Sequence, residues 1–314
     1  MSSPGKVVDL HGIAVDIDQL VSLRSAAQHL RLLRNDKKNS GRAGEYRSRW
    51  SARGMEFAES RVYIPGDDVR SIDWRITARR GEIFTKVFQE EREKPLILVA
   101  DFSSSMYFGT RRVFKSVLAA ELCALLAWNG LKRGDRIGGL IFSEAGHREL
   151  RPGGGHRNVL KLLQLLADYS VGKDRVESFS TDALESVLQR LRRVGKPGSS
   201  IILASDFYHL DREVERHLSR LTRHCRVILC HVFDPLEKAC PTFGQYPISS
   251  GRQTAVLDCS DPSVRKHFAR HFDKRWQFLD RMSRQYGMGL LHFSTDVSAA
   301  ETLGRAGPRA GLSF

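Results

Sequence analysis

The sequence predicts an α/β fold, in which a doubly wound, mostly parallel sheet follows an N-terminal brace of helical and irregular or β segments. Two apolar runs support this prediction, because Leu96–Ala100 and Ser200–Ala204 are continuous and each ends close to an acidic residue. Such runs are typical of strands that helices bury on both faces. Strand and helix patterns also alternate after Pro95. We therefore expect two regions, residues 1–94 with the brace and residues 95–314 with the sheet.

The first region combines a helix, a basic stretch and a turn-rich segment. Asp18–Arg34 places leucines and an alanine at helical spacing, which predicts an amphipathic helix. Arg24–Arg53 holds nine Lys or Arg and two acids, a local charge of 9 − 2 = +7, and its polar part, Asn35–Arg53, is expected to be a loop. Arg61–Trp74 is irregular around a Pro-Gly-Asp-Asp turn signal, and Ile83–Gln89 alternates like a strand.

The second region contains the succession of elements that a doubly wound sheet needs. The expected strands are Leu96–Ala100, Arg136–Phe142, Arg148–Leu150, Ser200–Ala204, Arg226–Phe233 and Gly289–Phe293. The expected helices are Arg112–Arg133, His156–Tyr169, Thr181–Val194, Asp211–Arg223, Pro262–Tyr286 and Val297–Arg305. Asp234–Asp258 contains three prolines and is expected to be looser. In open α/β sheets the functional crevice lies beyond the carboxyl ends of the strands, where the strand order reverses.

The composition is that of an ordinary globular protein with a basic excess. Hydrophobic residues make up 41%, and Lys and Arg outnumber Asp and Glu by 50 − 36 = 14. This composition excludes wholesale disorder, a collagen-like repeat and a disulfide scaffold. The charge attracts acidic proteins, nucleic acid or anionic lipid without choosing among them. We expect reduced cysteines, no membrane span and a cytoplasmic location, because no secretory signal and no apolar run of about 20 residues is present.

One loop carries a pattern suited to metal binding. Asp101, Ser103 and Ser105 form D-x-S-x-S directly after the first buried strand. One carboxylate and two hydroxyls can converge on a hard cation, and Mg²⁺ takes about six oxygen ligands and keeps several waters. Because the two hydroxyls are neutral, such an ion gains from a carboxylate that a partner supplies. The aspartates that follow the two buried strands can instead cap the next helices, and this alternative stays open.

The D-x-S-x-S pattern resembles the metal-ion-dependent adhesion site of von Willebrand factor A domains. The resemblance implies that a threonine from a second loop and an aspartate from a third complete the metal shell, and Thr181 and Asp206 match these two positions in order. It implies a von Willebrand factor A-like fold for the sheet region. It also implies one divalent cation, Mg²⁺ or another, held by Asp101, Ser103, Ser105, Thr181 and Asp206.

A longer motif precedes the sheet region. From Gly54 the chain has G-x-E-F, R-x-Y, P-G-D-D-x-R-x-I-D-W and A-R, followed by D-x-S-x-S. This run resembles the bacterial domain-of-unknown-function family fifty-eight over about half the chain, from Gly54 to Phe207. The resemblance implies a partnership with a MoxR-type AAA+ ATPase in the assembly or maturation of other proteins. From the residues themselves, we expect Tyr63–Arg79 to brace the sheet region, with a buried Trp74 and ion pairs between neighbouring aspartates and arginines.

Signatures of common enzymes are absent from the sequence. It contains no G-x-x-x-x-G-K-[ST], no G-x-S-x-G and no C-x-x-C. The glycine run Gly153–Gly155 lacks the lysine of a phosphate loop and fits a turn before a helix. Cys225 and Cys230 are expected to be core residues, since their neighbouring histidines cannot join them in one zinc site. We therefore expect a non-enzymatic, metal-dependent adaptor for protein–protein interaction, with a nucleic-acid-binding protein or an unrecognised metal-dependent hydrolase as alternatives.

Overall fold

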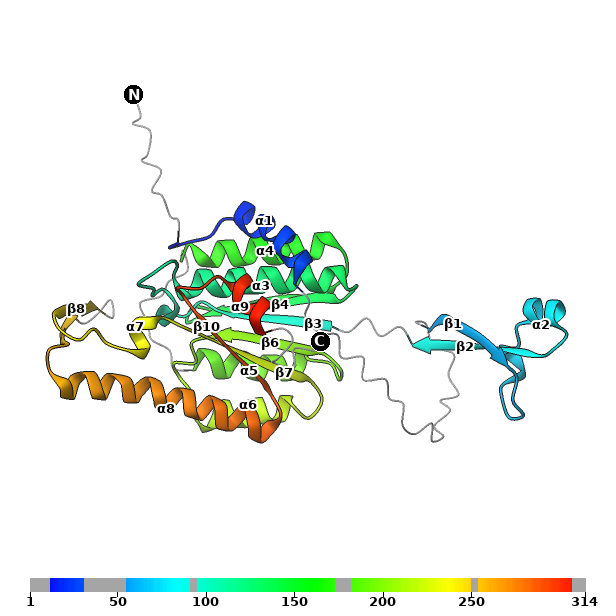
Figure 1. The fold of residues 1–314 in the computed structure, drawn as a ribbon. Coiled ribbons are helices and arrows are strands. Elements are labelled where there is room, and N and C mark those ends of the chain that lie inside the picture. The colour runs from blue at the N-terminus through cyan, green and yellow to red at the C-terminus, as the bar shows by residue number, and fades with distance from the viewer. Residues whose placement is uncertain (1–11, 31–54, 91–94, 173–181, 250–253, 307–314) are drawn as a thin grey trace, which may run out of the picture. The chain divides into compact units, whose positions relative to one another are not determined.

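The computed structural model describes residues 12–30, 55–90, 95–172, 182–249 and 254–306. They fall into two compact units (Figure 1). The larger unit comprises Met1–Asp36 and Lys94–Phe314, and the smaller unit comprises Lys37–Glu93. No helix among the described residues is long and apolar enough to cross a membrane.

The larger unit is built around a six-stranded sheet with the order β10-β7-β6-β3-β4-β5. All neighbouring strands are parallel except β4 and β5. The strands are β3 (Pro95–Asp101), β4 (Arg136–Ser143), β5 (Gly146–Gly153), β6 (Ser200–Ser205), β7 (Arg226–Phe233) and β10 (Gly289–Ser294). This confirms the expected α/β architecture with a mostly parallel sheet.

The order of the strands reverses at β3. The chain runs from β3 outward through β4 to β5, and it then returns to the other side of β3 as β6. β3 and β6 pair directly, with Ala100 beside Ala204. Asp101 ends β3 and Asp206 follows β6, so the two acids lie at the carboxyl ends of adjacent strands, where a crevice is expected.

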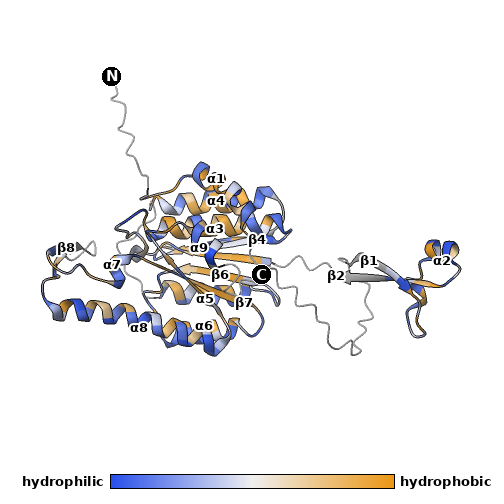
Figure 2. Cartoon of the chain, viewed as in Figure 1, coloured by the Kyte–Doolittle hydropathy of each residue, from blue (hydrophilic) through white to orange (hydrophobic). Residues whose placement is uncertain are grey.

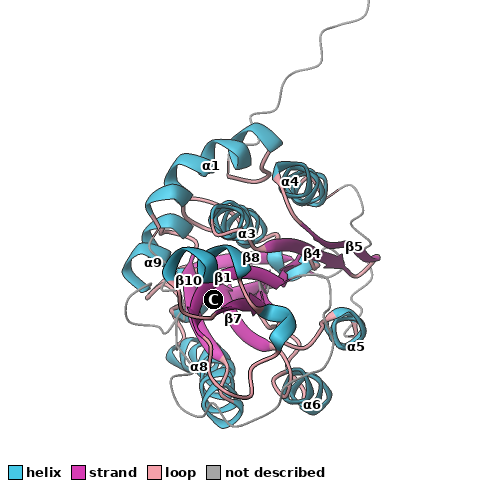
Figure 3. Ribbon diagram, turned by 90° about the vertical axis from the view of Figure 1, so that its right-hand side faces the viewer, coloured by secondary structure: helices cyan, strands magenta, loops and turns pink. Residues whose placement is uncertain are grey.

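Helices cover both faces of the sheet (Figure 3). One layer consists of α1 (Ile17–His29), α3 (Lys115–Lys132), α4 (His156–Ser170) and α9 (Ala299–Ala306). The other consists of α5 (Ala183–Val194), α6 (Arg212–Leu221) and α8 (Pro262–Tyr286). Alternate residues of β3 enter different cores, because Leu98 packs in the first layer and Val99 in the second. The central strands β3, β6 and β7 are accordingly mostly apolar, whereas α6 and α8 combine hydrophilic and hydrophobic residues (Figure 2).

Helix α1 belongs to the larger unit, although the sequence groups it with the brace. An Asp16 capping box starts the helix, and Leu20 is buried against the sheet unit. The Trp128 indole on α3 donates to the carbonyl of Leu20 at 3.1 Å. This packing places α1 with the sheet, although residues 31–54, which precede β1, lie outside the described part of the chain.

The smaller unit is a β-hairpin with two short helical segments. β1 (Met55–Val62) pairs with β2 (Phe84–Glu90), and η1 (Val69–Ser71) and α2 (Trp74–Arg80) lie between them. The expected strand matches β2, whereas β1 and α2 were not predicted. Gly66 has a positive φ of 108°, as the turn signal indicates.

Two expectations about the smaller unit are corrected. Of the three motif aspartates, Asp67 pairs with Arg61 at 2.8 Å, whereas Asp68 and Asp73 accept backbone N–H groups as helix caps. Trp74 was expected to be buried, but it is 68% exposed. Trp74 is the first residue of α2, and the unit buries Ile72 and Phe84 instead.

The proline-containing stretch after β7 is more ordered than expected. It contains α7 (Pro235–Lys238) and a hairpin of β8 (Gln245–Ser249) with β9 (Thr254–Asp258). A Cys240–Cys259 disulfide joins the two ends of this hairpin segment, which corrects the expectation of five reduced cysteines. Cys225 and Cys230 are free and buried, as expected.

Candidate functional site

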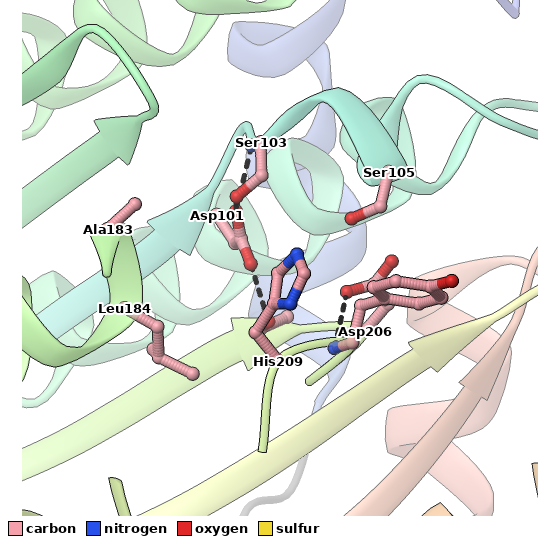
Figure 4. A pocket seen from close by; sticks show the side chains of 9 residues that line it. Asp101, Ser103, Ser105, Ala183, Leu184, Asp206 and His209 are labelled. Carbon is pink, nitrogen blue, oxygen red and sulfur yellow. Dashed lines mark hydrogen bonds between the residues drawn. The ribbon is translucent and has the colours of Figure 1, made fainter. Parts of the chain in front are cut away.

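Asp101 is a buried carboxylate at the end of β3 (Figure 4). Its Oδ1 accepts hydrogen bonds from the backbone N–H of Ser103, at 2.8 Å, and from the Ser103 hydroxyl. Its Oδ2 accepts from the Ser205 hydroxyl at 2.5 Å. These bonds fix the carboxylate between its own loop and the end of β6.

Two further carboxylates hold the loop that follows β3. Glu144, after β4, accepts from the backbone N–H of Ser104 at 2.7 Å and from its hydroxyl at 2.6 Å. Asp234, after β7, accepts from the backbone N–H of Thr110 at 2.8 Å and from its hydroxyl at 2.6 Å. The loop is therefore anchored from both sides of β3, which pre-organises the serines for binding. Sequence reasoning missed both anchors.

Asp206 lies beside Asp101 but has a cation of its own. The buried Lys115, at the start of α3, donates to Asp206 Oδ2 and to Glu237 Oε1, each at 2.7 Å. Asp206 Oδ1 accepts from the backbone N–H of Tyr208 at 3.0 Å. The intervening Phe207 has a positive φ of 50°, which is uncommon for a bulky residue and marks a tight turn directly after Asp206.

The Lys115–Asp206 pair is ionised. Burial by itself raises the pKa of Asp206, but the adjacent Lys115 ammonium outweighs it, and the pKa is lowered. Burial likewise works to lower the pKa of Lys115, and the carboxylates of Asp206 and Glu237 outweigh it, so that this pKa is raised. A buried charge is tolerated in this way when a partner lies in contact with it.

Asp101 has no such partner. Among the described residues, no cationic side chain lies within ion-pair distance of it. Burial, followed by the negative charge of Asp206, raises the pKa of Asp101 to about 7. This carboxylate therefore lacks a positive charge at the place where the sequence predicts a metal ion, and its oxygen-rich surroundings suit a hard dication.

Four of the five predicted metal ligands line one small pocket. Its lining comprises Asp101, Ser103, Ser105, Ala183, Leu184, Ser205, Asp206, Tyr208 and His209. The Ser105 hydroxyl helps to lower the pKa of Asp206. Thr181 lies outside the described residues, two positions before Ala183. Any dication here would be held by Asp101 and the two serine hydroxyls, and Lys115 would leave Asp206 only one oxygen for it or for its water.

Asp101 and Asp206 do not occupy the N-cap positions of the described helices that follow β3 and β6, so the alternative that they cap these helices is wrong. The cap position of the next turn after β3 is Ser103, that of α3 is Phe114 and that of α6 is Asp211. The glycine run before α4 is the expected turn, with Gly155 at the cap position and a positive φ of 82°.

Comparison with known proteins identifies a family of undetermined role. Residues 59–277 match the family described as "Protein of unknown function DUF58". Uncharacterised proteins of Mycobacterium tuberculosis (strain ATCC 25618 / H37Rv) and Mycobacterium bovis are 28% identical over 282 residues, which cover 90% of this chain and 87% of each relative. The uncharacterised YeaD protein of Bacillus subtilis is 39% identical over 66 residues, 21% of this chain and 17% of that protein.

Among solved structures, the conserved hypothetical protein BatB from Bacteroides thetaiotaomicron aligns with 70% of this chain and 98% of its own. The TM-score is 0.42 and the identity 12%. Proximal thread matrix protein 1 of the mussel byssus aligns with 44% of this chain and 38% of its own, with a TM-score of 0.33 and 16% identity.

Proposed function

The chain belongs to the DUF58 family, and we propose that it is a non-enzymatic, metal-dependent adaptor that binds an acidic side chain of a partner protein. The observation that carries the proposal is Asp101, a buried carboxylate beside two serine hydroxyls and without a cation of its own. As part of the same proposal, the larger unit is a von Willebrand factor A-like domain. D-x-S-x-S after β3 and Asp206 after β6, at the reversal of strand order, support it.

Lys115 explains why Asp101, and not Asp206, is the carboxylate that we assign to the metal ion. Because its ammonium engages Asp206, Asp101 is the one carboxylate in the pocket free of an ion pair among the described residues. A dication bound by Asp101 and neutral hydroxyls keeps net positive charge. A carboxylate from a partner protein then completes the ligand shell and neutralises the ion. The neutral hydroxyl ligands therefore favour binding of an acidic partner.

Basic residues lie on the helix that borders the pocket. Arg275 on α8 donates to the carbonyl of Asp206 at 3.2 Å and lies over the ring of Tyr208 at 5.0 Å, so α8 borders the pocket. Lys266, Arg270 and Lys274 form an exposed ridge along the same helix. Such a ridge speeds and orients the approach of an acidic partner, and its contribution falls as salt rises.

The partner in this proposal is a MoxR-type AAA+ ATPase, with the adaptor recognising the ATPase during assembly or maturation of other proteins. The support is the resemblance of the residue 54–79 motif to a family whose members are typically encoded beside such ATPases, together with the absence of a phosphate loop from this chain. Nucleotide hydrolysis would then belong to the ATPase, and this protein would supply recognition.

The test is binding of a purified MoxR-type ATPase to this protein in Mg²⁺, measured by calorimetry. We expect at least a tenfold loss of affinity in Asp101→Asn, in Asp101→Ala and after chelation. Asp168→Ala removes an exposed acid on α4 and serves as the matched control with unchanged affinity. Affinity that survives both chelation and the Asp101 variants contradicts the proposal.

One observation favours a second function, metal-dependent hydrolysis. His209 lines the same pocket as Asp101, and a histidine near a metal-bound water can act as a general base. A screen of phosphate and carboxylate esters with and without Mg²⁺ distinguishes the two functions. Turnover that requires Mg²⁺ and falls at least a hundredfold in His209→Ala would replace the adaptor proposal, whereas its absence leaves recognition as the role of the pocket.

A further inference from the structure

We propose a second metal site, for a first-row transition dication of the Zn²⁺ type, between α5 and α6. Glu185, Glu213 and His217 each offer one ligand atom, and these three atoms lie within 4.8 Å of one another. None of the three lines the Asp101 pocket. The site therefore stands independently of the proposed adaptor function.

The helical repeat explains how the three side chains meet. Glu213 and His217 are four residues apart on α6, so they project from one face of the helix. Glu185 lies in the first turn of α5, and α5 packs against α6 (Figure 3). Two ligands from one helix and a third from its neighbour are a common way to build a metal site on helices.

His217 is the residue that points to a ligand. Its side chain is 4% exposed and its Nε2 has no hydrogen-bond partner in the described part of the chain. The Glu185 carboxylate oxygen Oε1 is 3.6 Å from Nε2, which is longer than a hydrogen bond. A buried ring nitrogen without a partner is unfavourable, and a metal ion between His217 and the carboxylates would satisfy it.

The two glutamates give the site access and charge. Their side chains are 28% and 44% exposed, so an ion can enter from solvent and retain water ligands. Two carboxylates neutralise a dication. One imidazole nitrogen with two carboxylate oxygens suits Zn²⁺, Co²⁺ or Mn²⁺, whereas Mg²⁺ prefers oxygen alone.

Other side chains contact the three proposed ligands. One of them, Arg192, distinguishes a metal site from a cluster that binds no metal. Gln189 donates to Glu185 Oε1 at 3.0 Å, and Arg216 pairs with Glu213. Arg192 approaches His217 Nδ1 at 3.4 Å. A metal on Nε2 requires the proton on Nδ1, so binding must displace Arg192. If His217 instead serves only as a polar contact between Arg192 and Glu185, the cluster binds no metal.

The experiment is titration of the full chain with Zn²⁺ and Co²⁺ in excess Mg²⁺, by calorimetry and by the visible spectrum of bound Co²⁺. We expect one site whose affinity falls at least tenfold in His217→Gln and in Glu213→Gln. Arg192→Ala should bind equally or more tightly. Glu215→Gln, on the same helix, and Asp101→Asn should leave binding unchanged, and this separates the site from the Asp101 pocket.

Folding of each variant is checked by its circular dichroism, and Glu185→Gln replaces any variant that fails to fold. Co²⁺ binding should show the spectrum of nitrogen and oxygen ligands. Absence of a Zn²⁺ site in the wild-type chain, Zn²⁺ affinity unchanged in folded His217→Gln, or a thiolate spectrum from the free cysteines would each overturn the proposal.

Discussion

The loops after β3 and β6 place two aspartates side by side with opposite electrostatics. Asp101 and Asp206 are both buried and both sit at strand ends. The pKa of Asp206 is lowered although burial opposes this, because Lys115 contacts it, whereas the pKa of Asp101 is raised to about 7. Burial alone therefore does not decide the charge of an acid at this site. The neighbouring cation decides it, and only Asp101 remains available to recruit one.

The largest expected effect comes from removing that cation. Lys115→Met leaves the carboxylate of Asp206 buried without its ion-pair partner, and Glu237 also loses its contact. We expect a loss of about 3–5 kcal/mol in the free energy of unfolding, the range for breaking a buried pair on one side. Urea denaturation at neutral pH measures it.

A second variant shows whether charge is the cause. Asp206→Asn in the Lys115→Met background removes the unpaired carboxylate, and we expect the double variant to recover part of the lost stability. A double variant no more stable than Lys115→Met would mean that lost packing, and not an unpaired charge, dominates.

The next effect concerns two histidines under the Asp206 loop. His231, which pairs in register with Ser205, has Nδ1 3.1 Å from that of His292. Burial, and then the charge of the neighbour, lowers the pKa of His231 to about 3, and burial lowers that of His292 to about 4. Both are neutral in the folded protein.

The unfolded chain binds protons at these histidines near pH 6.5, whereas the folded protein does not. The free energy of unfolding therefore falls as pH drops from about 6.5 towards the folded pKa values. At pH 5 we expect each histidine to reduce the free energy of unfolding by roughly 2 kcal/mol relative to pH 7. His292→Phe keeps a ring against Trp276 and should remove its share of this loss. Acid sensitivity equal to that of the wild type would show that His292 titrates normally.

The smallest expected effect is the pH dependence of the free energy of unfolding that Asp101, unlike Asp206, causes near neutral pH. A folded pKa of about 7 favours the protonated form, so without metal the stability contributed by Asp101 falls as pH rises through 7. Between pH 6.5 and 8 we expect a loss of about 1 kcal/mol in the metal-free protein, which is absent in Asp101→Asn.

Mg²⁺ should reverse this trend in the wild type, because it binds the ionised carboxylate. Thermal melts with chelator or with Mg²⁺ at the two pH values give the comparison. Equal pH dependence of wild type and Asp101→Asn without metal would mean that Asp101 is already ionised at pH 6.5.

Local sequence patterns predicted the sheet and the grouping of side chains in the loop after β3, because each depends on residues close in the chain. Leu96–Ala100 forms most of β3, and Asp101, Ser103 and Ser105 come together within five residues. Lys115 contacts Asp206 across 91 positions, and Thr110 contacts Asp234 across 124. No local pattern contains such contacts, so the ion pair and the loop anchors required the fold.

In the smaller unit, the motif that marked the family did not reveal its structure. Asp68 and Asp73 looked like members of an ion-pair network, but their carboxylates cap short helical segments. Each aspartate lies two residues before an arginine, so the sequence alone does not distinguish an ion pair from a helix cap there. The sequence predicts a buried Trp74 within the brace, but a large ring at a first-turn helical position can stay exposed.

The antiparallel strand β5 has a consequence for self-association. A strand at the margin of a sheet presents unpaired backbone groups to which another molecule can add. β5 carries Arg148, Glu149, Arg151 and Pro152, and its pairing with β4 shifts register between Ile137 and Gly139. Charge, a missing N–H and an irregular backbone each discourage such addition, so this margin is protected against the cross-molecule pairing that leads to aggregates.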